Sequence, residues 1–273
     1  FTVRQSRTSA RPFEPITANP YDYDARTEAE CPEYGPLDSQ YHMTSVYFDE
    51  DYALGIGYFK ENIYDSLYRT LIPSGAVWRS KNPYARLVVS HPYWYANYKP
   101  APWGAPSPKD MWSGVSPFRQ VVHNENAAIF LYHIPDVDPY KDIKLRWGPR
   151  WAPPARSEQP LPSCFAYYPT TMDEKKWIHG IFFLREGDVY IAIRPLRNGA
   201  GWAECAMPEY ARIDLPGTVT GCVVEIGDKS EYGSFEIFQE QLAKAKLDTT
   251  ALLNNQRVSY VSARGTQLEI QLD

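Results

Sequence analysis

Four polar side chains that can donate, accept or exchange protons follow one another at His123, Asn124, Glu125 and Asn126. They come directly before the apolar run 127–133, which is typical of a buried β-strand. A rigid sheet can hold such side chains in a groove, and a neutral histidine beside a carboxylate is a suitable acid–base pair. We predict catalytic roles for His123, Asn124 and Glu125 and a substrate-binding role for Asn126. The structural alternative is that these residues cap a strand edge and satisfy backbone groups of the loop.

A second candidate site begins at His91, which is followed by Tyr93 and Trp94. The proline-rich segment after them adds Trp103 and Trp112. Aromatic rings offer flat faces to the C–H side of sugar rings, while histidine and tyrosine side chains reach sugar hydroxyls. We predict a catalytic role for His91. We predict substrate-binding roles for Tyr93, Trp94, Trp103 and Trp112. The alternative is a core aromatic cluster that fixes a loop.

Two further residues complete the predicted site. Arg119 lies four residues before His123 and can hold a carboxylate by a two-pronged hydrogen bond, which suits a catalytic role; solvation at the surface is the alternative. His42 opens the first β-rich run, and we expect it to face the same groove as a substrate-binding residue, with a structural role as the alternative.

Several classes of function are not supported by the sequence. The net charge of −5 and the pI of about 5.6 argue against binding of nucleic acid. No apolar run approaches the roughly 20 residues that a membrane helix needs. The chain has no GxSxG elbow, no glycine-rich phosphate loop and no HExxH motif, so we expect no metal and no cofactor.

The four cysteines are Cys31, Cys164, Cys205 and Cys222, and they show no metal-ligand spacing. Disulfides are plausible, and we favour Cys205 with Cys222 because a hairpin-sized loop lies between them. The alternative is buried free thiols in a reducing compartment.

The composition favours strands joined by rigid loops, since 15% of the residues are aromatic and 24 are proline. We predict a mainly β fold, a large antiparallel β-sandwich with long proline- and aromatic-rich loops and one short helix near the C-terminus. The helix is expected over 234–246, where Phe235, Phe238 and Leu242 recur at helical spacing after Ser234 as a cap. Strands are predicted at 44–48, 52–56, 76–79, 85–90, 127–133, 178–185, 189–195, 257–263 and 267–272.

Residues 1–40 carry many turn formers and little periodicity, so we expect an extended arm that contacts an upstream domain or a partner chain. Residues 41–273 are expected to form the sandwich domain. Because the chain opens at Phe1 without an apolar leader, we expect a processed protein or a part of a longer polypeptide, secreted or periplasmic.

The segment 42–55, together with Ser116-Pro117-Phe118 and 123–128, resembles the C-terminal half of heparinase II/III-type polysaccharide lyases. In that group an α/α toroid precedes a multi-stranded β-sandwich, and the cleft lies between them. The resemblance implies that this chain corresponds to the β part and that His123 or His91 adds a histidine to the cleft. No residue here can be matched to the family's catalytic tyrosine.

The leading hypothesis is therefore the β-sandwich part of a secreted carbohydrate-active enzyme, a polysaccharide lyase or hydrolase. It would be incomplete without an upstream domain, and its substrate would be a polysaccharide. The alternatives are a non-catalytic glycan-binding module and a structural or assembly subunit of an extracellular complex.

Overall fold

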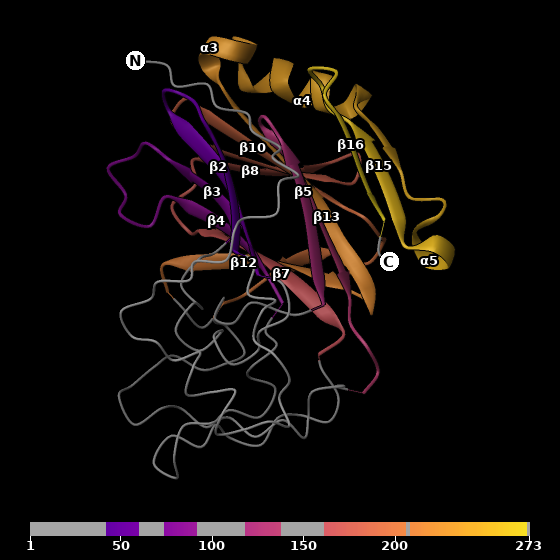
Figure 1. The fold of residues 1–273 in the computed structure, drawn as a ribbon. Coiled ribbons are helices and arrows are strands. Elements are labelled where there is room, and N and C mark those ends of the chain that lie inside the picture. Colours follow the sequence, from indigo (N-terminus) through magenta and orange to yellow (C-terminus); the bar gives the residue numbers. More distant parts are fainter. Residues whose placement is uncertain (1–41, 60–73, 92–117, 138–160, 206–207, 272–273) are drawn as a thin grey trace, which may run out of the picture.

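The computed structural model describes residues 42–59, 74–91, 118–137, 161–205 and 208–271. In these ranges the protein is mainly β. Two antiparallel sheets pack face to face as a sandwich, and a third layer of one small sheet and short helices covers one of them (Figure 1). The fold class predicted from the sequence is confirmed.

The first sheet has seven strands within the described ranges. From edge to edge these are β1 (His42–Phe48), β2 (Tyr52–Phe59), β3 (Ser74–Trp78), β4 (Arg86–Ser90), β7 (Ser163–Pro169), β12 (Tyr210–Pro216) and β11 (Gly201–Ala203). Every neighbouring pair is antiparallel.

The second sheet has six strands in the described part of the chain. In spatial order they are β5 (Arg119–Asn124), β6 (Ala127–His133), β13 (Val219–Asp228), β10 (Val189–Pro195), β9 (Ile181–Glu186) and β8 (Glu174–Ile178). All neighbours are again antiparallel.

The central strands of the six-stranded sheet are apolar on both faces. On β6, Phe130 and Tyr132 lie in the core between the two large sheets, whereas Ile129 and Leu131 pack beneath the third layer. This arrangement confirms the buried strand predicted over 127–133.

The third layer follows β13 in the chain. It consists of α3 (Lys229–Tyr232), α4 (Phe235–Lys244), β14 (Lys246–Asp248), α5 (Leu252–Asn255), β15 (Arg257–Val261) and β16 (Gln267–Gln271). Helix α4 begins as predicted, because the Ser234 hydroxyl accepts a hydrogen bond from the Ile237 amide at 3.3 Å. It ends at Lys244, two residues before the predicted end, since Lys246 already begins β14.

One predicted strand, 178–185, is wrong at its start. Ile178 pairs with Ile181, and between them His179 and Gly180 both have positive φ angles, 52° and 76°. Two consecutive left-handed residues are the signature of a tight hairpin turn, so β8 and β9 are separate strands. The next turn, at Gly187 and Asp188, joins β9 to β10.

The predicted disulfide between Cys205 and Cys222 is wrong. Cys222 lies on the inner face of β13 in the core of the sandwich. Cys205 packs with Phe165 and Tyr167 on the opposite, outer face of the seven-stranded sheet. A sheet separates the two side chains, and no disulfide forms among the cysteines in the described ranges. The short loop between the two cysteines favoured this pairing, but loop length does not indicate which face of a sheet each side chain occupies.

Two sequence predictions fall outside the described residues. They concern the arm over residues 1–40 and the proline-rich segment within 92–117 with its tryptophans.

Candidate functional site

The polar cluster predicted at residues 123–126 forms the turn between β5 and β6. Asn126 is fully buried, and its Nδ2 donates a hydrogen bond to the Ile226 carbonyl at 2.7 Å. The Glu125 carboxylate accepts a hydrogen bond from the Thr266 hydroxyl at 3.2 Å. The His123 ring is buried and bonded to the backbone of Glu125, and burial lowers its pKa. These contacts hold the turn against β13 and the third layer, while Asn124 is half-buried opposite Ala127.

Arg119 and His91 lie at the other end of β5, between the two large sheets. A guanidinium nitrogen of Arg119 donates to the Ser74 hydroxyl at 2.9 Å. His91 is 1% exposed, its Nε2 donates to the Leu161 carbonyl at 2.9 Å, and its ring lies 6.1 Å from that of Tyr132. Burial lowers the pKa of His91 to about 4, so this ring is neutral at physiological pH.

The structure therefore divides the predicted catalytic residues into two groups. Arg119 is the register partner of Tyr132, and His91 packs on the same ring, so these two are brought together. His123 lies four residues further along β5, about 13 Å away at the rise of a β-strand. The catalytic roles of both groups stay predictions.

The remaining predicted residues are not placed. Tyr93, Trp94, Trp103 and Trp112 lie outside the described residues. His42 begins β1 opposite Phe59, and its side chain also lies outside the described part of the chain.

A buried carboxylate that the sequence analysis did not single out lies on the outer face of β13. Glu225 is 1% exposed and accepts hydrogen bonds from Tyr260 at 2.7 Å, Tyr232 at 3.3 Å and the Ala263 amide at 3.3 Å. Burial raises the pKa of Glu225 from 4.5 to about 7, although these donors act in the opposite direction. Glu225 thus joins β13 to α3 and to the loop that connects β15 and β16.

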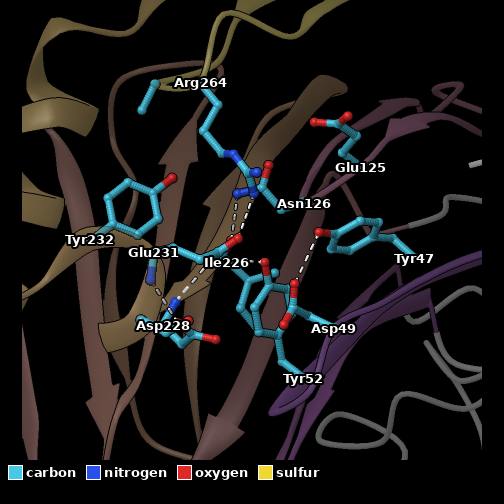
Figure 2. A network of polar contacts seen from close by, with 12 residues as sticks. Tyr47, Asp49, Tyr52, Glu125, Asn126, Ile226, Asp228, Glu231, Tyr232 and Arg264 are labelled. Carbon is cyan, nitrogen blue, oxygen red and sulfur yellow. Dashed lines mark hydrogen bonds and ion pairs between the residues drawn. The ribbon is translucent and has the colours of Figure 1, made fainter. Parts of the chain in front are cut away.

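Next to it, an ion pair joins the same loop to α3, and a tyrosine of the first sheet hydrogen-bonds to that pair (Figure 2). Arg264 donates to Glu231 of α3 at 2.5 Å, and the Tyr52 hydroxyl of β2 donates to the other oxygen of Glu231 at 3.0 Å. Tyr47 of β1 donates to Asp49 at 3.2 Å beside this pair. Burial raises the pKa of Glu231 and of Tyr52. The network joins the third layer to the first sheet.

An exposed aromatic pair lies on the opposite edge of the sandwich. Trp177 is on β8 and Trp202 on β11, the edge strands of the two large sheets, and they are 43% and 41% exposed. The Phe182 ring lies between them, 3.9 Å from Trp177 and 4.6 Å from Trp202 by ring centroids. The indole centroids are therefore at most about 8.5 Å apart. We call Trp177 and Trp202 the edge aromatic pair.

The rings of the edge aromatic pair are held by buried neighbours. Phe182 meets both indoles at steep angles, 67° and 83°, and the nearly buried Tyr168 meets Trp202 edge-on at 5.7 Å. Lys175 is exposed and, two residues before Trp177, lies on the same face of β8. Fixed, half-exposed rings beside a cationic donor can stack on a flat apolar face and hydrogen-bond its polar rim.

The sequence contains a partial signal for this pair. Lysines in a short strand are typical of a sheet edge, and Lys175 and Lys176 both lie in β8. The signal for Trp202 is weaker, because β11 has only three residues. Their proximity depends on how the two sheets stack, which no local pattern in the sequence contains.

In the described ranges, no group of three or more histidine, cysteine, aspartate or glutamate side chains is arranged to hold a metal ion. None of the helices found there is both long and apolar enough to cross a membrane. No protein-family model, no curated protein and no solved structure matches this chain.

Proposed function

We propose that this chain is a glycan-binding β-sandwich, part of a carbohydrate-active protein, and that the edge aromatic pair is its contact with sugar. The observation that carries the proposal is the exposure of two tryptophans, 43% and 41%, on either side of one buried phenylalanine. Two large, partly exposed aromatic rings at the same place on the surface are typical of an interaction site, which supports a binding role.

The chemistry of the pair suits a pyranose ring. Such a ring has an apolar C–H face and a polar rim, and an indole stacks on the former while lysine or water bonds the latter. Because Phe182 and Tyr168 hold the indoles in place, little side-chain entropy is lost on binding.

Binding is favoured over turnover as the role of this chain by the burial of the predicted catalytic residues. His91, Arg119 and His123 are all buried, and each has hydrogen-bonding partners within the fold. Acid–base chemistry needs a group within hydrogen-bond reach of the substrate. A lyase or hydrolase activity of the whole protein would then draw its reacting groups from elsewhere.

The proposal predicts that Trp177→Ala and Trp202→Ala each weaken binding to an array of neutral and acidic oligosaccharides by about tenfold or more, as expected for central aromatic contacts. Tyr84→Ala is the matched control, since Tyr84 is also 41% exposed and makes an edge-on ring contact, with Tyr210, outside the pair. Tyr84→Ala should bind as the wild type does. Equal affinity of all three variants and the wild type would reject the pair as the sugar contact.

A triple substitution of Trp94, Trp103 and Trp112 separates this site from the stacking surface predicted from the sequence. If that variant loses affinity and the edge variants do not, sugar binds at the loop instead. If the edge variants unfold, the conservative pair Trp177→Phe and Trp202→Phe, which keeps the apolar cover of the core, provides the comparison.

A further inference from the structure

The loop between β15 and β16, residues 262–266, is held by three glutamates from three different elements. Glu225 of β13 accepts the Ala263 amide, Glu231 of α3 pairs with Arg264, and Glu125 of the β5–β6 turn accepts the Thr266 hydroxyl. The C-terminal sheet packs on the sandwich through an apolar cluster that includes Val258 and Ile270, and the polar contacts of its loop are made by carboxylates, whose charge depends on pH.

Glu225 differs from the other two because it is fully buried, and among the described residues no cation contacts its carboxylate. Its strand neighbours in register are Ala127 and Ala192, whose small side chains leave room for the Tyr232 and Tyr260 rings above the carboxylate. Its hydrogen-bond donors are two phenols and one amide, all neutral. A buried carboxylate with only neutral donors is costly to ionise.

The charged and titratable groups around Glu225 come from every element packed on it. Arg264 of the loop is engaged by Glu231, and Arg194 of β10 donates to the Ala245 carbonyl at 2.8 Å. Tyr232 of α3 and Tyr260 of β15 have raised pKa values, because of burial first and of Glu225 second, so both remain protonated donors. In the part of the chain that the structure describes, no cation therefore touches the Glu225 carboxylate, and the charge of Arg264 lowers its pKa less than burial raises it.

Tyr232 is a fixed donor to Glu225. A hydrogen bond from the Asn126 amide lowers the pKa of the Tyr232 hydroxyl, against the larger effect of burial. Tyr232 cannot move aside easily, because its ring occupies the space of a side chain at Gly227, where a Cβ would lie 2.3 Å from Tyr232 Cε2.

We propose that protonated Glu225 holds the C-terminal sheet against the six-stranded sheet, and that loss of this proton releases the β15–β16 end of that sheet. The device is a pH-sensitive attachment built into the third layer, independent of sugar binding at the opposite edge. Release uncovers the outer face of β6, including Ile129 and Leu131, which the C-terminal sheet covers.

The direction of the pH dependence follows from the raised pKa of Glu225. The pKa of Glu225 is raised from 4.5 to about 7 in the docked state. The contribution of Glu225 to docking is therefore fully present below pH 4.5, weakens as the pH rises toward 7, and is at its smallest above 7. A group with a lowered pKa would produce the opposite trend.

Hydrogen exchange of the full-length chain tests the proposal. After correction for the intrinsic pH dependence of exchange, the opening equilibrium of amides 258–270 should increase on the order of tenfold between about pH 5.5 and pH 8. Glu225→Gln should abolish this increase, whereas Glu240→Gln, the same change on the exposed face of α4, should leave it unchanged. An increase that persists in Glu225→Gln, or that is absent in the wild type, overturns the proposal.

Tyr260→Phe supplies a second test if Glu225→Gln does not fold. It removes the shortest hydrogen bond to the carboxylate, 2.7 Å, and therefore raises the pH at which Glu225 ionises. The midpoint of the exchange transition should move to higher pH. An unmoved midpoint would count against Glu225 as the titrating group.

Discussion

Burial decides the protonation state of His91. The ring is enclosed between the two sheets and its pKa falls from 6.5 to about 4, so the folded protein keeps it neutral where an unfolded chain would bind a proton. Stability due to this residue is present above pH 6.5 and is lost as the pH falls toward 4. A histidine held neutral in this way acts as a fixed donor to the Leu161 carbonyl.

The prediction at this scale concerns His91→Gln, which keeps a donor for Leu161 but does not titrate. From pH 7 to about pH 5, the wild type should lose about 2 kcal/mol more unfolding free energy than the variant does. Urea denaturation at the two pH values measures the difference. Parallel pH dependence in both proteins would show that His91 is not the residue that binds the proton on unfolding.

At the scale of elements, α4 shows how a local signal and a tertiary contact combine. Ser234 caps the helix through the Ile237 amide, and Phe235 and Phe238 fill the outer face of β9 and β10 with Phe183. Short helices gain most of their stability from such packing rather than from propensity. The Ser234 cap adds stability at the first turn of α4, where the backbone amides have no acceptor within the helix.

Removal of the cap should be measurable on its own. Ser234→Ala is expected to lower the unfolding free energy by about 1 kcal/mol, since the Ile237 amide then lacks its acceptor. Ser234→Asp, which retains an acceptor at the same position, is the control and should remain within a few tenths of a kcal/mol of the wild type. Equal loss in both variants would point to packing rather than capping.

For the whole molecule, Glu225 and His91 have opposite effects on the pH dependence of stability. Between about pH 5 and pH 7 the stability due to Glu225 falls by about 2 kcal/mol, while that due to His91 rises by about the same amount. The two side chains lie on opposite faces of the six-stranded sheet and share no hydrogen-bond partner in the described structure. Their contributions should therefore add independently.

This compensation predicts a pattern across three variants in chemical denaturation. From about pH 5 to pH 7, the unfolding free energy of Glu225→Gln should rise more steeply than that of the wild type. Over the same interval, the unfolding free energy of His91→Gln should fall relative to that of the wild type. The double variant should return to the wild-type slope. A double variant whose slope follows only one of the single variants would contradict independent titration.

The sequence by itself determined the features that depend on near neighbours in the chain. A nearly continuous apolar run identified β6, and helical spacing after Ser234 identified α4. These features follow from side-chain periodicity and turn chemistry, which act over a few residues. The fold class was predictable for the same reason.

The tertiary structure alone decided which polar and aromatic side chains are buried, and beside what. The polar residues from Arg119 to Asn126 lie together in the sequence, yet the strand separates Arg119 from the turn and buries both ends. Conversely, Trp177 and Trp202 are distant in the chain and meet across Phe182. Burial sets the pKa of Glu225 and of His91, and it depends on segments distant in the chain that pack over each residue. The local sequence pattern does not contain this information.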